Sequence, residues 1–355
     1  MKKILIIGAQ GYLGSRLSDY LLKRGYLCTG LDTGFFKNGV LFEPHPIEII
    51  KKDARTIEPK DLKGFDIVLM LAGISNDPFG NLKADVIYDP TFDYAIKIAR
   101  FCKQQGIRYI FPSSCSVYGI GQGQLDENSE VNPQTHYSIN KVQIEQALIK
   151  ISDKNFSPIA LRLATVFGIS PRMRFDIVIN MLCGLALTEN KIILNSNGEA
   201  WRPHLHIEDV CEAFRCCIDW DYQDGALMVL NVGRNDNNWK IIDIAKIIQK
   251  QISGCELEFL HETNSNLKND LVKDRKIQDG VDTRTYQVSF DKINEILPGF
   301  EAKWHVEQGI IDLLDNLKHW NVNDAKFKQR DFYRLQQLEF LHQTKQISDD
   351  LFWTI

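Results

Sequence analysis

The sequence predicts an α/β fold in which a doubly wound parallel sheet is followed by a smaller mixed α/β lobe. Short apolar runs alternate with amphipathic stretches in the first half of the chain, and this rhythm indicates βαβ units. The runs at residues 66–71 and 109–111 show no alternation of apolar and polar residues, as expected of strands that helices cover on both faces. A chain of 355 residues also exceeds one comfortable hydrophobic core, which favours two lobes.

The expected elements of the first half follow one another at short intervals. We expect strands at residues 3–7, 26–31, 66–71, 107–112 and 159–163. We expect helices at residues 12–24, 91–105 and 137–151. The last of these helices follows the start signal Pro133-Gln134-Thr135. Beyond about Gly168 the pattern loosens into helices and short strands separated by polar segments, which is where we place the second lobe.

These patterns divide the chain into three parts. The expected parts are a first domain over residues 1–167 with a return segment near 204–233, a second lobe mainly over 168–320, and a helical tail over 321–355. The tail carries apolar residues at helical spacing, namely Phe332, Leu335, Leu338 and Leu341. We therefore expect the tail to pack back on the body of the protein.

Composition and charge exclude several classes of protein. A net charge of -4 argues against a nucleic-acid-binding protein, which needs clustered Lys and Arg residues to contact the phosphates. No window approaches the roughly 18 apolar residues of a membrane span. The eight cysteines form no CxxC pair, and His204 and His206 alternate along an expected strand without a third ligand, so neither a disulfide framework nor a metal site is indicated. We expect reduced thiols, no metal and a cytoplasmic location.

Three glycines mark the turn after the first strand. Gly8, Gly11 and Gly14 have the spacing G-x-x-G-x-x-G at the expected entry to the first helix. Glycine permits a tight turn and close approach of the backbone to phosphate, and a helix N-terminus presents free N–H groups to it. A plain tight turn is the alternative, because this spacing differs from the standard Rossmann fingerprint. The placement favours a dinucleotide site and hence a Rossmann domain.

A carboxylate at the end of the second strand indicates which dinucleotide binds. Asp32 follows the first glycine by a little over 20 residues, where it can accept hydrogen bonds from the adenosine ribose hydroxyls. Its charge would repel a 2′-phosphate, which favours NAD over NADP. Lys37 is close in sequence and keeps NADP as the alternative.

The strongest chemical signal joins a strand end to the start of a helix. Residues 113–119 (Ser-Ser-Cys-Ser-Val-Tyr-Gly) end a buried strand, and Tyr137 precedes Lys141 by one helical turn. The two side chains share a helical face, and the ammonium favours tyrosinate next to it. In an open parallel sheet the ligand crevice lies beyond the carboxyl ends of the strands, so Ser114 and the glycine turn point to the same site.

Taken together and in this order, these motifs resemble the extended short-chain dehydrogenase/reductases, within them the nucleotide-sugar epimerase and dehydratase branch. The likeness covers roughly residues 1–315 and also includes residues 71–73 (Leu-Ala-Gly) and 201–209 (WRPHLHIED). It implies that Tyr137 is the acid/base, that Lys141 holds the nicotinamide ribose and lowers the tyrosine pKa, and that Ser114 binds the reacting sugar oxygen. It further implies that Asp53 binds adenine.

The resemblance also implies two sets of binding residues. The cofactor set is Gly8, Gly11, Tyr12, Leu13, Gly14, Asp32, Asp53, Ala54, Leu71, Ala72, Gly73, Tyr137 and Lys141. The set for a nucleotide-diphosphate sugar is Ser114, Cys115, Ser116, Arg172, Arg174, Asn180, Arg202 and Arg284. A guanidinium fork suits paired phosphate oxygens. A capping or solvated polar role is the alternative for Arg172, Arg174 and Asn180, and a structural role for Arg202.

Several reactions suit this resemblance. Dehydratases of the family carry an acid pair after the Ser/Thr, where this chain has Cys115 and Ser116, so dehydration is disfavoured. A 4-epimerase acting through a keto-sugar is the favoured hypothesis, with a dehydrogenase or keto-sugar reductase and a non-catalytic NAD-binding regulator as alternatives. Cys115 is a minor acid/base candidate, and a packed thiol is the favoured interpretation. Pairing of the helices at 91–105 and 137–151 would give a homodimer.

Overall fold

The computed structural model describes residues 2–75, 84–259 and 284–354. Its largest sheet has seven strands in the order β11-β7-β5-β4-β1-β2-β3, and every neighbouring pair runs parallel. In chain order these strands are β1 (Lys3–Ile7), β2 (Leu27–Asp32), β3 (Glu48–Lys51), β4 (Ile67–Met70), β5 (Arg108–Ser114), β7 (Ile159–Leu163) and β11 (Met228–Val232). This arrangement confirms the predicted doubly wound α/β fold.

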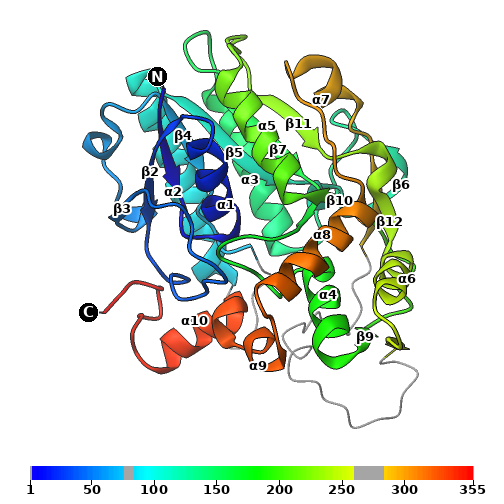
Figure 1. Ribbon diagram of the computed structural model, residues 1–355. Helices are drawn as coiled ribbons and strands as arrows, with labels where there is room; N and C mark the ends of the chain where they lie inside the picture. Colours follow the sequence, from blue (N-terminus) through cyan, green and yellow to red (C-terminus); the bar gives the residue numbers. More distant parts are fainter. Residues whose placement is uncertain (1, 76–83, 260–283, 355) are drawn as a thin grey trace.

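Helices cover both faces of the sheet (Figure 1). Successive residues of β1 enter different cores, because Ile4 and Ile6 belong to one cluster and Leu5 and Ile7 to another. The first cluster is shared with α1 (Tyr12–Leu22) and α5 (Ile207–Asp219). The second is shared with α2 (Ala84–Gln105) and α3 (His136–Ile151). Burial on both faces explains why these strands are continuously apolar.

Helix α2 is longer than the sequence predicts. It begins at Ala84 instead of residue 91 and contains Pro90. A proline removes one backbone donor and normally ends or kinks a helix. Here the turns before Pro90 are held by tertiary packing, since Ile87 and Tyr88 are buried against Leu338, Leu341 and other residues near the C-terminus. Long-range burial therefore overrides the local signal.

The second lobe is built on short sheets and a separate core. The strands are β6 (Ile120–Leu125) with β14 (Thr285–Val288), β8 (Thr165–Phe167) with β10 (Trp201–His206) and β12 (Asn238–Lys240), and β9 (Lys191–Leu194) with β13 (Glu256–Phe259). The helices are α4 (Val178–Glu189), α6 (Ile241–Gln251), α7 (Asp291–Ile296) and α8 (Val306–His319). A cluster that includes residues of α4, α6 and α8 forms its core. None of the helices in the described part of the chain is long and apolar enough to cross a membrane.

The last part of the chain is only partly helical. It contains α9 (Asp324–Phe327) and α10 (Arg334–Gln343), and after α10 a short bridge joins Ile347 to Trp353. Figure 1 shows this segment in red, running from α10 toward the side of the sheet that carries β2 and β3. The predicted packing against the body is confirmed by the shared cluster with α2.

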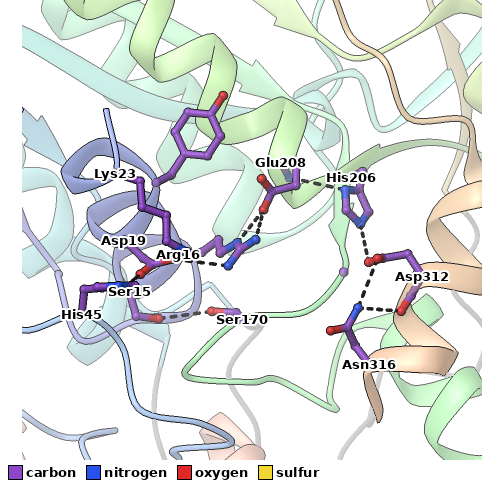
Figure 2. Close-up of polar contacts among 12 residues, drawn as sticks. Ser15, Arg16, Asp19, Lys23, His45, Ser170, His206, Glu208, Asp312 and Asn316 are labelled. Atoms are coloured by element: carbon purple, nitrogen blue, oxygen red, sulfur yellow. Dashed lines mark hydrogen bonds and ion pairs between the residues drawn. The ribbon is translucent and has the colours of Figure 1, made fainter. Parts of the chain in front are cut away.

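Polar contacts tie α1 both to α5 of the same domain and to the segment that opens the second lobe (Figure 2). Arg16 of α1 pairs with Glu208 at the start of α5. One residue earlier, Ser15 lies 3.2 Å from Ser170, measured between the hydroxyl oxygens. The Ser170 hydroxyl also donates to the carbonyl of Tyr12, at 2.8 Å. The segment that opens the second lobe is therefore attached directly to the first turn of α1.

Candidate functional site

The glycine turn forms a tight cradle between β1, α1 and the end of β4. Gly8 has a φ of +94°, and a Cβ on it would lie 2.6 Å from the backbone nitrogen of Ala72. A Cβ on Gly14 would collide with the carbonyl oxygen of Gly8. Gly11 precedes α1, and no side chain caps the helix there. The first N–H groups of α1 are thus available to an anion at the turn.

A cavity opens from this turn along the ends of β1, β2 and β4, and it encloses about 780 Å³ of empty space, part of which is open to solvent. Its lining includes eight residues of the predicted cofactor set: Gly8, Gly11, Asp32, Asp53, Ala54, Leu71, Ala72 and Gly73. Apolar side chains such as Phe35, Ile74 and Ile87 form much of the remaining wall. The mostly apolar lining with a few polar groups suits a cofactor, and the cradle suits its pyrophosphate. Tyr12, Leu13 and Gly14 lie in the first turn of α1 and do not line the cavity.

The Asp32 carboxylate is fixed at the end of β2. It accepts hydrogen bonds from the backbone N–H of Gln10 at 2.8 Å and of Gly34 at 2.7 Å. Burial raises the pKa of Asp32, and these N–H donors together with Arg172 oppose the rise. Each carboxylate oxygen retains a lone pair, which can accept a ribose hydroxyl. Lys37 is exposed.

A second carboxylate, Asp53, lies at the far side of the same cavity. It caps the short 3-10 helix Ala54–Thr56, and the guanidinium of Arg55 forks onto it with contacts of 2.9 and 2.6 Å. Arg55 also lines the cavity. Sequence reasoning missed this residue, although its position two residues after Asp53 could have indicated the pair. The predicted contact of Asp53 with adenine stays a prediction.

The proposed catalytic groups lie on α3 and at the end of β5. The Lys141 ammonium is 5.4 Å from the centre of the Tyr137 ring and donates to the carbonyl of Pro112 at 2.6 Å. Two residues further along β5, the Ser114 hydroxyl accepts from the backbone N–H of Ser116. Tyr137 also packs in the cluster that contains Ile87 of the cavity wall. Tyr137, Lys141 and Ser114 do not themselves line the cavity, and their meeting in one active site stays a prediction.

Burial lowers the pKa of Lys141 to about 7, and Glu145 opposes this only in part. In the unfolded chain a lysine titrates near 10.4, so the unfolded state binds more protons between about pH 7 and 10. The buried lysine therefore costs most stability at or below pH 7, and the cost fades as the pH rises. We expect Lys141→Met to unfold at a higher temperature than wild type at pH 7, with a difference that shrinks toward pH 10. A difference independent of pH in thermal melts would contradict the lowered pKa.

A buried ion pair sets the position of α3 against the sheet. Glu145 of α3 and Arg162 of β7 are 2.7 Å apart and both nearly inaccessible. Ser113 of β5 donates to the same carboxylate, and Arg162 also donates to the hydroxyl of Tyr118 at 2.9 Å. Polar contacts thus join α3, β5 and β7 in the interior.

The Cys115 thiol belongs to the core. The residue is 1% exposed within the main cluster, and its sulfur contacts the carbonyl oxygen of Arg162 at 3.1 Å. Burial raises the pKa of the thiol, which makes a thiolate unavailable for acid/base work. The geometry supports the packed-thiol interpretation. By contrast, the buried hydroxyl of Ser116 has no hydrogen-bond partner among the described residues and is free to meet a ligand.

The arginines predicted to bind the diphosphate form two groups, Arg202 with Arg284 and Arg172 with Arg174. Arg202 of β10 donates to the carbonyl of Arg284, and its guanidinium lies 5.3 Å from the ring centre of Tyr286. Arg172 donates to the carbonyl of Lys37. Arg174 pairs with Asp176 at 2.8 Å. The contacts of these arginines with a diphosphate stay predictions.

Asn180 is used within the protein. Its side-chain oxygen accepts from the N–H of Gly168, and its amide nitrogen donates to the Tyr12 hydroxyl and to the carbonyl of Arg174. These bonds fix the loop that carries Arg172 and Arg174 against α1. The capping alternative therefore suits Asn180, and its contact with substrate also stays a prediction. Within the described ranges, no group of three or more His, Cys, Asp or Glu side chains could hold a metal ion.

Comparisons with known proteins agree with this geometry. The model of the NAD dependent epimerase/dehydratase family matches residues 4–233. A Bacillus subtilis (strain 168) protein described as the uncharacterized UDP-glucose epimerase YtcB is 27% identical over 273 residues, which are 69% of this chain and 82% of that protein. The bifunctional polymyxin resistance protein ArnA of Wigglesworthia glossinidia brevipalpis is 28% identical, over 70% of this chain and 41% of its own length.

Two solved structures show the same fold. UDP-glucuronic acid 4-epimerase from Bacillus cereus, in complex with UDP-glucuronic acid and NAD, has a TM-score of 0.70 and 22% identity, covering 89% of this chain and 99% of that one. The NAD-dependent NDP-hexosamine 5,6-dehydratase TunA, of tunicamycin biosynthesis, has a TM-score of 0.75 and 21% identity, covering 90% and 98%.

Proposed function

Because the chain belongs to the NAD dependent epimerase/dehydratase family, whose cofactor is NAD, we propose that it is a nucleotide-sugar epimerase acting through a transient keto-sugar. We place the reacting centre at sugar carbon 4. The observation that carries this proposal is the Tyr137–Lys141 pair on α3. Its ammonium bonds to the carbonyl of Pro112, two residues before Ser114, and Tyr137 packs in the same cluster as Ile87 of the cavity wall. The names of the B. subtilis relative and the B. cereus structure support it.

The side chains have distinct roles in this proposal. Tyr137 takes the proton of the sugar hydroxyl, and Ser114 orients the same oxygen. Lys141 stabilises the tyrosinate by its charge. When bound, NAD supplies the two-electron acceptor and donor for the reacting carbon. Tyr137 returns the proton after the keto-sugar has presented its other face.

The residues that follow Ser114 favour epimerisation over dehydration. Cys115 and Ser116 occupy the positions after Ser114. Of the two carboxylates that act on Cys115, Glu145 is paired with Arg162 and Glu127 accepts from the N–H of Asn231. Expulsion of a hydroxyl needs a positioned acid. The TunA structure keeps dehydration among the outcomes to be measured.

Two further features belong to the proposal. One is the expected homodimer, formed through α2 and α3, which rests on the family resemblance and is tested by light scattering of the purified protein. The binding partner is a nucleotide-diphosphate sugar, and the relatives named above point to UDP as its nucleotide.

A single assay separates the candidate functions. The purified protein is denatured to identify released nucleotide, and intact NAD-loaded protein is offered UDP-, GDP-, CDP- and dTDP-sugars. We expect a sugar of inverted configuration with no net change in NADH absorbance. Net NADH change would identify a dehydrogenase or reductase, and loss of water from the sugar, by mass spectrometry, a dehydratase. No turnover of any sugar by a protein that binds NAD would indicate the non-catalytic alternative.

A further inference from the structure

The segment after α10 reaches the cofactor cavity from the far end of the sequence. Leu351 is part of the cavity wall together with Asp32, Asp53 and Ala54. These are the positions where the adenosine half of NAD is expected. The segment Gln346–Thr354, here called the C-terminal hairpin, is closed by the bridge between Ile347 and Trp353 and by a bond from the N–H of Thr354 to the carbonyl of Gln346 at 3.0 Å.

Arg55 ties this hairpin to the adenosine end of the cavity. Its guanidinium, already forked onto Asp53, donates to the carbonyls of Asp350 at 2.5 Å and Leu351 at 2.8 Å. The ring of Phe352 lies under the same guanidinium, 3.4 Å from ring centre to the guanidinium carbon. Charge-assisted bonds and a stacked cation are among the stronger polar contacts. One side chain thus connects the hairpin to a predicted adenine-binding carboxylate.

Trp353 ties the hairpin to the end of β2. Its indole N–H donates to the carbonyl of Thr33 at 2.7 Å, directly after Asp32. The indole also packs on Phe35, with ring centres 5.4 Å apart. Thr33 and Phe35 both line the cavity. The hairpin therefore contacts both sides of the adenosine end.

Leu351 adopts a backbone conformation that a leucine rarely takes. Its φ is +57°, yet the side chain is only 4% exposed. A bulky residue at positive φ costs free energy and persists only where its surroundings hold it. Here the Arg55 and Trp353 contacts hold the loop, and Leu351 joins the cluster with Ile87 and Tyr88 of α2. Strain of this kind often accompanies a binding role.

We propose that the C-terminal hairpin is a built part of the NAD site, in which Leu351 forms the apolar wall beside the adenosine while Arg55 and Trp353 hold that wall in place. The hairpin then slows release of NAD. This inference goes beyond the proposed function, because it concerns the cofactor and applies whichever sugar reacts. A retained cofactor suits chemistry in which NAD is restored within each turnover.

A matched pair of glycine variants tests the wall. Leu351→Gly removes the side chain and relieves the positive φ, which glycine adopts freely. Lys345→Gly is the control, since Lys345 has nearly the same φ of +56° and is exposed outside the cavity lining. We expect Leu351→Gly to weaken binding of NAD and of AMP alike, by about tenfold, as loss of a buried apolar contact predicts. Calorimetric titration of each ligand gives the affinities, and Lys345→Gly should match wild type.

Trp353→Phe provides a second variant that keeps an aromatic ring but removes the indole N–H together with part of the ring surface that packs on Phe35. Loss of this partly buried hydrogen bond predicts release of NAD about fivefold faster, measured after a chase with excess ADP-ribose. If circular dichroism shows that Leu351→Gly does not fold, the rate of NAD release from Trp353→Phe is the test of the inference.

Two results would overturn the inference. One is wild-type affinity and release in every folded variant, and the other is weakened NAD binding with unchanged AMP binding. No sugar is present in these assays, so their failure leaves the epimerase proposal standing. Conversely, a protein that turns over no sugar can still show hairpin-dependent NAD binding.

Discussion

Replacing Tyr137 by phenylalanine is expected to lower kcat on the accepted nucleotide sugar by about 100- to 10,000-fold, the usual contribution of a positioned acid/base. The change removes one hydroxyl and keeps the ring, which packs near Tyr88 and in the cluster with Ile87. Because the ring contacts persist, NAD affinity and thermal stability should stay close to wild type. Stopped-flow and steady-state assays of the epimer product measure kcat. A calorimetric titration with NAD measures the NAD affinity.

Tyr26→Phe is the control for loss of a tyrosine hydroxyl. Tyr26 bonds to Asp219 at the surface, at 2.6 Å, and it does not line the cofactor cavity. The kcat of Tyr26→Phe should equal that of wild type. Unchanged turnover in Tyr137→Phe would show that another group moves the proton, and it would remove the basis for assigning the chain an acid/base on α3.

The elements of the Rossmann domain could be predicted because each of them leaves a pattern within a few consecutive residues. Each strand of the large sheet is buried on both faces, as the cores on either side of β1 show, and this leaves a continuous apolar run in the sequence. The glycine turn and the Tyr137–Lys141 spacing are likewise short motifs, whose geometry follows from one turn or one helical face. The start of α2 was predicted wrongly because packing across the fold, and not the local proline, decides it.

No local sequence pattern indicated the cavity residues Arg55 and Leu351, which the sequence analysis did not predict. Arg55 and Leu351 are 296 positions apart, and nothing in either neighbourhood indicates the other. Arg334 is a similar case, since its buried guanidinium lies over the Phe36 ring at 4.4 Å and burial lowers its pKa to about 9. Such contacts depend on where α10 docks, which a single sequence does not reveal. The role of Asn180 shows the same limit, because its amide is occupied by partners distant in the chain.

The largest effect on stability is expected from breaking the Glu145–Arg162 pair. Glu145→Gln leaves a guanidinium buried without its counter-charge, and removing one partner of a buried pair typically costs about 3–5 kcal/mol. The side chains are 5% and 8% exposed, so water cannot replace the lost carboxylate. Urea titrations followed by circular dichroism should show this loss in the free energy of unfolding. Because Glu145 also holds α3 against β5 through Ser113, kcat should fall as Tyr137 and Lys141 lose their alignment with Ser114.

Two comparisons separate the buried charge from other causes. Glu199→Gln breaks an exposed pair with Lys240, where the side chains are 56% and 32% exposed, and should leave the free energy of unfolding close to that of wild type. Replacing both buried partners, as Glu145→Leu with Arg162→Met, removes the unpaired charge and should restore much of the stability. The double variant should nevertheless remain slow in turnover, because the Ser113 contact that aligns α3 is absent. Equal losses for Glu145→Gln and Glu199→Gln would mean that the Glu145–Arg162 pair is not desolvated, and α3 would then owe its position to apolar packing alone.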